Sequence, residues 1–118
     1  MASRRIEDLT PEMQVMYRHF ESSMTDAGLE FLVTCTYRSQ QEQDALYTQG
    51  RLHPGKIVTW TKHSKHAEHK AFDIAMMENG KISWEDKNYQ KAGKIGESVG
   101  LIWGGEWHPP DLAHFQTA

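Results

Sequence analysis

Two stretches of this 118-residue chain carry side chains that suit a metal-dependent hydrolysis. In the first, which runs from residue 63 to 75, His66 stands at the mouth of an apolar run and Asp73 within it. In the second, near the C-terminus, Asp111 stands three residues before His114. A catalytic zinc ion takes three protein ligands from His, Asp, Glu or Cys and keeps a fourth position for water or substrate. The spacing therefore predicts a zinc site with ligands His66, Asp73 and His114, and with Asp111 as the general base.

Asp73 is the most informative of these residues, because Ala71–Met77 has the pattern of a buried strand. An ionised carboxylate inside an apolar run is costly unless a cation or a hydrogen-bonded partner compensates it. His66 and Asp73 differ in parity, and residues on one face of a strand share their parity. A bend must therefore lie between them, and the polar residues 68–70 can supply it.

Other histidines offer alternative ligand sets. His63, His66 and His69 recur at three-residue spacing and could line one face of a helix, but no apolar face opposes them. We expect His108 to lie at the rim of a cleft or on the surface. From the residues alone, these assignments stay open beside the favoured one.

Two glutamates compete with Asp111 for the role of base. Glu68 could be a ligand or a base, and Glu106 lies in a loop rich in Gly, Pro and Trp that suggests the wall of a cleft. Carboxylates in loops are more often solvated than buried, so both are weaker candidates than Asp111.

Helices and strands must bring these distant residues together. Thr10 and Pro11 suit the start of a helix, and residues 39–42, Ser-Gln-Gln-Glu, form a capping box that starts another. Arg38 stands just before that capping box, at a strand-to-helix junction where functional side chains are common, although an arginine that ties down a loop is about as common. The predicted helices are Pro11–Asp26, Gln40–Gln49 and Asp86–Val99, and the predicted strands or strand-like pieces are Glu30–Tyr37, Lys56–Trp60, Ala71–Met77, Lys81–Trp84, Leu101–Trp103 and Leu112–Gln116.

Composition excludes several classes of protein. The chain is 38% hydrophobic and 25% charged, and it has no apolar run near the ~20 residues that span a bilayer. A net charge of -3 without a basic run gives nucleic acid nothing to bind. The N-terminus has acidic residues where a signal peptide would be apolar, so we expect synthesis in the cytoplasm. The single cysteine, Cys35, excludes an internal disulfide, and its surroundings predict a buried side chain.

The motifs, taken in order, resemble those of zinc D-alanyl-D-alanine carboxypeptidases and L-alanyl-D-glutamate peptidases, the second group being largely phage endolysins. Ser64-x-His66, Ala71-x-Asp73 and Asp111-x-x-His114-Phe115 match the Ser-x-His-x-x-Gly-x-Ala-x-Asp and Asp/Glu-x-x-His patterns. The chain departs from the pattern at His69, which replaces the glycine. The resemblance covers about residues 31–116 and includes Tyr37-Arg38-Ser39, Gln43, Leu46-Tyr47, Gln49-Gly50-Arg51, Pro54–Thr59, Trp103-Gly104-Gly105 and Trp107.

This resemblance implies a small α+β fold, an antiparallel sheet flanked by helices, with residues 1–118 forming one peptidase domain around a zinc cleft and no separate cell-wall-binding domain. It implies that zinc (Zn2+) is the cofactor and that Asp111 is the base. Arg38 would stabilise an oxyanion or hold a substrate carboxylate. Ser64 would bond to substrate or to a ligand, and we expect Trp107 and His69 to contact the substrate.

The implied function is that of an endolysin, a zinc-dependent hydrolase that cleaves the L-alanyl-D-glutamate bond of the peptidoglycan stem peptide. Such an enzyme would act as a monomer on the host cell wall after the membrane is permeabilised. One alternative is a D-alanyl-D-alanine carboxypeptidase or dipeptidase. Another is a non-catalytic, zinc-containing wall-binding module, but the presence of Asp111 and Arg38 argues against it, because a structural zinc needs neither.

Overall fold

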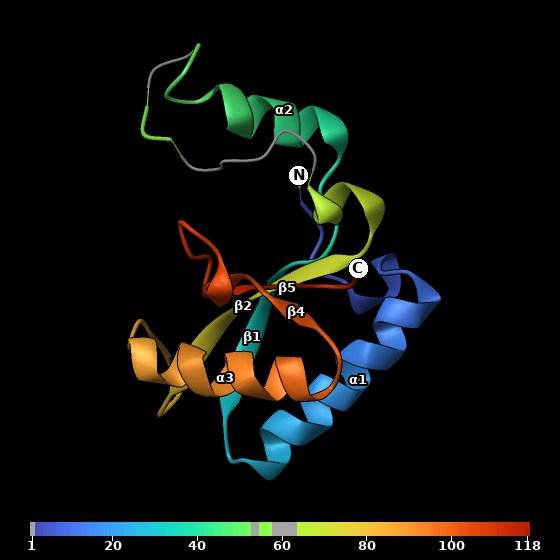
Figure 1. Ribbon diagram of the computed structural model, residues 1–118, viewed down its shortest axis with the longest axis vertical. Coiled ribbons are helices and arrows are strands. Elements are labelled where there is room, and N and C mark those ends of the chain that lie inside the picture. Colours follow the sequence, from blue (N-terminus) through green and yellow to red (C-terminus); the bar gives the residue numbers. More distant parts are fainter. Residues whose placement is uncertain (1, 53–54, 58–63) are drawn as a thin grey trace.

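The fold is built around an antiparallel sheet (Figure 1). The computed structural model describes residues 2–52, 55–57 and 64–118. Its strands run in the order β1-β2-β5-β4, and β3 also pairs with β2. The described strands are β1 (Glu30–Cys35), β2 (Ala71–Glu78), β3 (Lys81–Ser83), β4 (Ile102–Trp103) and β5 (His114–Gln116). The described helices are α1 (Pro11–Asp26), α2 (Gln40–Thr48) and α3 (Asp86–Ser98), with the 3-10 turns η1 (Ile6–Asp8), η2 (Lys65–Glu68) and η3 (Gly104–Glu106).

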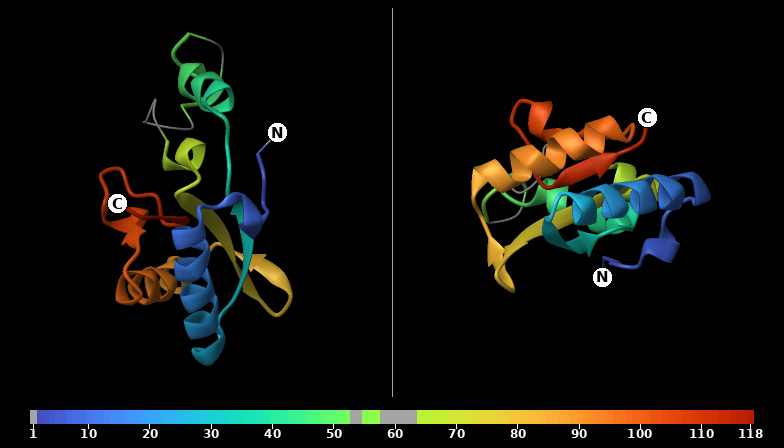
Figure 2. Two further views of the ribbon diagram at one scale, coloured as in Figure 1. Left: turned by 90° about the vertical axis from the view of Figure 1, so that its right-hand side faces the viewer. Right: turned by 90° about the horizontal axis from the view of Figure 1, so that it is seen from below.

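Helices α1 and α3 contact each other and pack on one face of the sheet. Alternate residues of β2, namely Phe72, Ile74 and Met76, enter this core together with Phe115 of β5. Helix α2 lies apart from this layer, beyond η2 (Figure 2). The predicted α+β class, with an antiparallel sheet flanked by helices, is therefore confirmed. No helix in the described ranges has both the length and the apolar character needed to cross a bilayer.

The opposite face of the sheet bears the polar residues of interest. Asp73 lies between Phe72 and Ile74 on β2, so its side chain is on the face opposite to theirs. Its register partner on β5 is His114. On the other side of β2, Asp73 pairs with Cys35, after an irregularity in register between Val33 and Cys35. Asp73 therefore lies between a cysteine and a histidine that are distant from it in sequence.

Local sequence signals account for most element boundaries. The Thr10 hydroxyl accepts the Met13 N–H at the start of α1, and Ser39 and Glu42 form the predicted capping box of α2. Asn79 and Gly80 both have positive φ, as a tight hairpin turn requires. The predicted helices therefore match the observed ones to within a residue.

Three strand predictions differ from the structure by two residues or cannot be compared with it. The predicted strand Leu112–Gln116 begins at His114, because Leu112 and Ala113 form a turn. The predicted strand to Tyr37 ends at Cys35, because Thr36 donates its N–H to the Ser3 carbonyl oxygen and so bonds to the N-terminal segment instead of β2. The predicted strand Lys56–Trp60 lies mostly outside the described residues, and residues 56 and 57 are not in a strand.

Candidate active site

The three predicted ligands converge on one carboxylate oxygen. His66 Nε2 lies 3.2 Å from Asp73 Oδ1, and His114 Nδ1 lies 3.0 Å from the same atom. The two histidines are buried, with 2% and 6% of their surfaces exposed. They come from η2 and β5, and Asp73 comes from β2. The tertiary structure thus brings together three side chains that the chain separates by up to 48 positions.

A short turn positions His66. Ser64 precedes η2, and its hydroxyl oxygen accepts the His66 backbone N–H at 3.1 Å. The turn ends at His69, whose φ of 61° and ψ of 28° are left-handed. This is the bend that the parity of His66 and Asp73 predicts. The family's glycine is suited to this conformation, and His69 adopts it at a steric cost.

Contacts with Tyr37 and Asp8 hold His69 in place. Its ring stacks on Tyr37, with centroids 4.1 Å apart and 7° between the planes. Its Nδ1 lies 2.6 Å from the Asp8 carbonyl oxygen. His66 and His69 therefore have different partners, which does not fit the alternative of a three-histidine helix face. The third member of that alternative, His63, lies outside the described residues.

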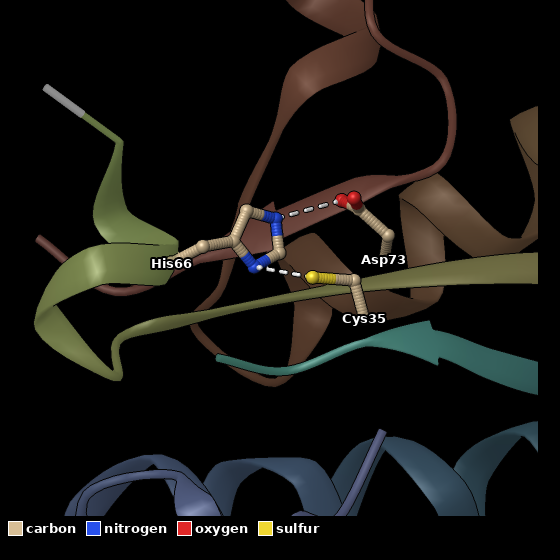
Figure 3. Close-up of side chains that lie close together, drawn as sticks. All are labelled: Cys35, His66 and Asp73. Carbon is tan, nitrogen blue, oxygen red and sulfur yellow. Dashed lines mark hydrogen bonds and ion pairs between the residues drawn. The ribbon is translucent and has the colours of Figure 1, made fainter. Parts of the chain in front are cut away.

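Hydrogen-bond acceptors lie at the outer nitrogens of both histidines. His66 Nδ1 is 3.3 Å from the Thr36 carbonyl oxygen and 3.6 Å from Cys35 Sγ, so the ring lies between Cys35 and Asp73 (Figure 3). His114 Nε2 is 2.8 Å from Gln116 Oε1. A neutral imidazole has only one N–H, and these outer acceptors are placed to receive it. The nitrogens that face Asp73 then present lone pairs to an anionic oxygen.

This arrangement fits a divalent cation. Two nitrogen lone pairs and a carboxylate oxygen are favourable neighbours only when a cation, either a proton or a metal ion, lies between them. His66 Nε2 is buried and makes no hydrogen bond, although Asp73 is near. Two imidazoles and one carboxylate are also a donor set that zinc accepts in catalytic sites. His66, Asp73 and His114 therefore suit a zinc ion.

The charges of the trio are mutually stabilising. Burial by itself would lower the pKa of His66, but its ion-pair contact with Asp73 and the nearby Cys35 outweigh burial and raise that pKa. Burial by itself would raise the pKa of Asp73, but its contacts with His114 and His66 outweigh burial and lower it. The protonated His66 thus compensates the buried carboxylate where no metal ion does.

Asp111 lies beside this trio. Among the described residues, two groups could hold a metal ion, Cys35–His66–Asp73 and Asp73–Asp111–His114, and they share Asp73. The Asp111 N–H donates to the Gly104 carbonyl oxygen at 2.8 Å, and the His114 N–H donates to the Asp111 carbonyl oxygen at 3.2 Å. Burial of its carboxyl group and the negative charge of Asp73 raise the pKa of Asp111. A carboxylate with a raised pKa is a suitable proton acceptor.

The remaining predicted residues surround the centre at different distances. Arg38 donates from Nη1 to Gln43 Oε1 at 2.9 Å, and its Nη2 lies 3.8 Å from Cys35 Sγ. The Trp107 ring lies 5.1 Å from that of His114 and is 37% exposed, so it can meet a ligand at the centre. Glu106, the rival base, is exposed on η3.

Three contacts of the centre were not predicted from the sequence. Gln116 follows His114 by two positions on one strand, so strand parity could have placed the two side chains on the same face. The contact of Cys35 with His66 follows from the register irregularity in β1. The Thr36 carbonyl is a backbone group, and no side-chain pattern signals its role.

Comparison with known proteins gives the family. The sequence profile described as D-alanyl-D-alanine carboxypeptidase, of peptidase family M15, matches residues 58–117. The Peptidoglycan L-alanyl-D-glutamate endopeptidase CwlK of Bacillus subtilis is 30% identical over 112 residues, which cover 85% of this chain and 67% of that protein.

Solved structures share the fold. The L-Ala D-Glu endopeptidase ChiX of Serratia marcescens superposes with a TM-score of 0.80 at 23% identity, covering 100% of this chain and 89% of that one. The L,D-carboxypeptidase DacB of Streptococcus pneumoniae superposes with a TM-score of 0.66 at 18% identity. The match covers 93% of this chain and 66% of that one. With the sequence profile, the relative and the convergent donor set, the chain belongs to the D-alanyl-D-alanine carboxypeptidase family and is a metallopeptidase of family M15, whose members are zinc-dependent.

Proposed function

We propose that this protein is a zinc-dependent peptidoglycan hydrolase that cleaves the L-alanyl-D-glutamate bond of the stem peptide. The observation that carries the proposal is the convergence of His66 Nε2 and His114 Nδ1 on Asp73 Oδ1, with Asp111 beside them. Three ligands and an adjacent base suit a catalytic zinc, whereas a structural zinc has four protein ligands and needs no base. The choice of bond is supported by the activity named for the Bacillus subtilis relative.

The chain's own residues supply the acid–base chemistry. When bound by His66, Asp73 and His114, zinc acts as a Lewis acid that polarises a carbonyl group and lowers the pKa of a water molecule to about 7. Asp111 takes the proton of the attacking water and passes it to the leaving amine. Burial of the Asp111 carboxyl group raises its pKa, which brings it closer to working pH and favours both transfers.

Residues around the centre position the peptide. The Arg38 guanidinium, held by Gln43, stabilises the developing oxyanion or pairs with a carboxylate of the stem peptide. Trp107 packs beside His114 and offers an aromatic surface to the substrate. Ser64 acts through the turn that it caps at His66. His69, whose ring stacks on Tyr37, would contact the substrate.

The biological setting of this proposal is phage-type lysis. The segments Gln49-Gly50-Arg51 and Pro54–Thr59 resemble the endolysin branch, and a monomeric catalytic domain synthesised in the cytoplasm would reach the host wall once the membrane is permeabilised. Expressed in bacterial cytoplasm, the protein should leave cells intact until chloroform is added and should then lyse them. Intact cells after permeabilisation, despite active zinc-loaded protein in the extract, would contradict the lytic role.

A D-alanyl-D-alanine carboxypeptidase is the second candidate, favoured by the description of the matching family profile. The two activities leave different products. An endopeptidase exposes a new N-terminal D-glutamate or isoglutamine on the stem peptide, whereas a carboxypeptidase removes the terminal D-alanine.

The decisive experiment is digestion of purified peptidoglycan, with and without a zinc chelator, followed by mass spectrometry of the fragments. A new N-terminal D-glutamate that disappears on chelation supports the proposal. Loss of D-alanine selects the carboxypeptidase, and the absence of both products favours a non-catalytic wall-binding module.

Two carboxylate variants test the mechanism in the same assay. Asp111→Ala should keep zinc and lose hydrolysis, whereas Glu106→Ala, a matched change at an exposed carboxylate on the neighbouring turn, should keep both. If Glu106→Ala loses hydrolysis and Asp111→Ala keeps it, Glu106 is the base instead of Asp111.

A further inference from the structure

Gln116 is placed to act on the metal centre through His114. Its backbone is anchored on both sides in the sheet, opposite Ala71 of β2 and Ile102 of β4. Phe115 points into the core beneath the sheet, so His114 and Gln116 share the opposite face. The Gln116 side chain reaches His114 from a rigid strand, and its Oε1 lies 2.8 Å from His114 Nε2.

The chemistry of this contact selects one form of the ring. An amide oxygen can only accept a hydrogen bond, so it requires a proton on His114 Nε2. A neutral imidazole that carries its proton on Nε2 has a lone pair on Nδ1, the nitrogen that lies 3.0 Å from Asp73 Oδ1. The other tautomer would place the proton where the metal ion must bind.

We propose that Gln116 is a positioning residue of the metal centre, which holds His114 in the tautomer whose Nδ1 is free for the ion and fixes the orientation of the ring. The inference rests on the proposed ligation of zinc by His114. For His66 the corresponding acceptor is the Thr36 backbone carbonyl, which no substitution removes. Gln116 is therefore a side chain through which the geometry of this centre can be altered without touching a ligand.

The glutamine also sets the strength of the ligand. An uncharged amide polarises the Nε2–H bond less than a carboxylate does, because hydrogen bonds to ionised acceptors are stronger. A carboxylate at this position would make His114 a more basic ligand. Gln116→Glu therefore keeps the acceptor, and Gln116→Met keeps the length of the side chain but removes the acceptor.

The test measures the zinc dissociation constant by competition with a chromophoric chelator. Outer hydrogen-bond partners of zinc-binding histidines contribute roughly 10- to 100-fold in affinity, so Gln116→Met should bind zinc weaker by that factor. Gln116→Glu should bind at least as tightly as the wild type. Gln90→Met, the same substitution at an exposed position of α3, is the matched control and should leave zinc affinity unchanged.

A second readout reports the tautomer directly. In the zinc-loaded wild type, the proton on His114 Nε2 should be visible by NMR and protected from exchange with water, and in Gln116→Met this protection should be lost. The melting temperature of the zinc-free variant shows whether the fold is intact. If Gln116→Met lowers the melting temperature, the test becomes the NMR spectrum of the zinc-loaded wild type. A proton on His114 Nε2 that is not protected from exchange with water in that spectrum overturns the proposal.

The outcomes separate this inference from the proposed function. Wild-type zinc affinity in a folded Gln116→Met protein overturns the positioning role, while zinc-dependent hydrolysis by the wild type leaves the proposed function standing. A wild-type protein that binds no zinc overturns both.

Discussion

Gly104 lies at the closest approach between η3 and the segment that carries the base. Its carbonyl oxygen accepts the N–H groups of Asp111 and Trp107, at 2.8 and 3.1 Å. A Cβ atom at Gly104 would lie 2.5 Å from the Asp111 carbonyl oxygen, 3.1 Å from Asp111 Cβ and 3.2 Å from His114 Cβ. Gly104→Ala therefore displaces the base while leaving every catalytic side chain chemically intact.

The size of the displacement follows from these distances. Ordinary contacts begin at 3.4 Å, so the Asp111 carbonyl must move away by about 0.9 Å, and His114 Cβ by about 0.2 Å. The closest atom belongs to the backbone, so rotation of a side chain cannot relieve the contact. Misplacement of a catalytic group by ~1 Å can cost on the order of 100-fold in rate, or about 2.7 kcal/mol in the barrier. We expect kcat/KM to fall roughly 10- to 100-fold, with a much smaller loss of zinc affinity.

The assay measures kcat/KM on a stem peptide, together with zinc content and the melting temperature. Gly80→Ala in the β2–β3 hairpin is the control, because φ there is +78° and a Cβ would meet nothing within 4 Å. Left-handed strain should cost it about 1 kcal/mol of stability without changing kcat/KM. Wild-type kcat/KM in a zinc-loaded Gly104→Ala enzyme would refute the link between this close approach and the position of Asp111.

Three further predictions concern the ligands and the base. Asp73→Ala should lose zinc and with it the stabilisation by the bound ion, about 4 kcal/mol at a free zinc concentration 1,000 times the Kd; one zinc per chain in this variant would remove Asp73 from the site. The contacts of His66 with Asp73 and Cys35 raise its pKa above the usual 6.5 despite burial. The ring therefore carries a second proton, and with it a positive charge, at pH 7 in the zinc-free protein. Zinc binding should therefore release protons, and zinc affinity should rise with pH. If calorimetry gives the same enthalpy of zinc binding in buffers of different ionisation enthalpy, no proton is released and the prediction is wrong. Burial and the charge of Asp73 raise the pKa of Asp111, so in the zinc-free protein its carboxyl should titrate by 13C NMR above the usual 3.8, and zinc should lower that pKa because a nearby cation favours the carboxylate; a pKa at or below 3.8 without zinc would contradict the first part.

The elements of the fold that depend on neighbours in sequence could be predicted without the structure. The helix that starts at Pro11 and the hairpin at Asn79-Gly80 follow from capping and from the turn that such residues favour. The need of Asp73 for a cation follows from the cost of a buried carboxylate, and the structure supplies His66 and His114. The parity of His66 and Asp73 also required the bend that ends at His69.

Which residues contact Asp73, His66 and His114 depends on pairing between strands and on segments far apart in sequence. The register of β2 with β5 places Asp73 opposite His114, and the irregularity in β1 brings Cys35 to the ring of His66. The Thr36 carbonyl oxygen and Gln116 Oε1 are placed to accept the N–H groups of His66 and His114, and the approach of Gly104 places Asp111. The sequence by itself determined which side chains could bind a metal ion, because that depends on residue type and local burial. Only the tertiary structure decided which nitrogen of each histidine faces Asp73, because that depends on groups brought close by long-range packing.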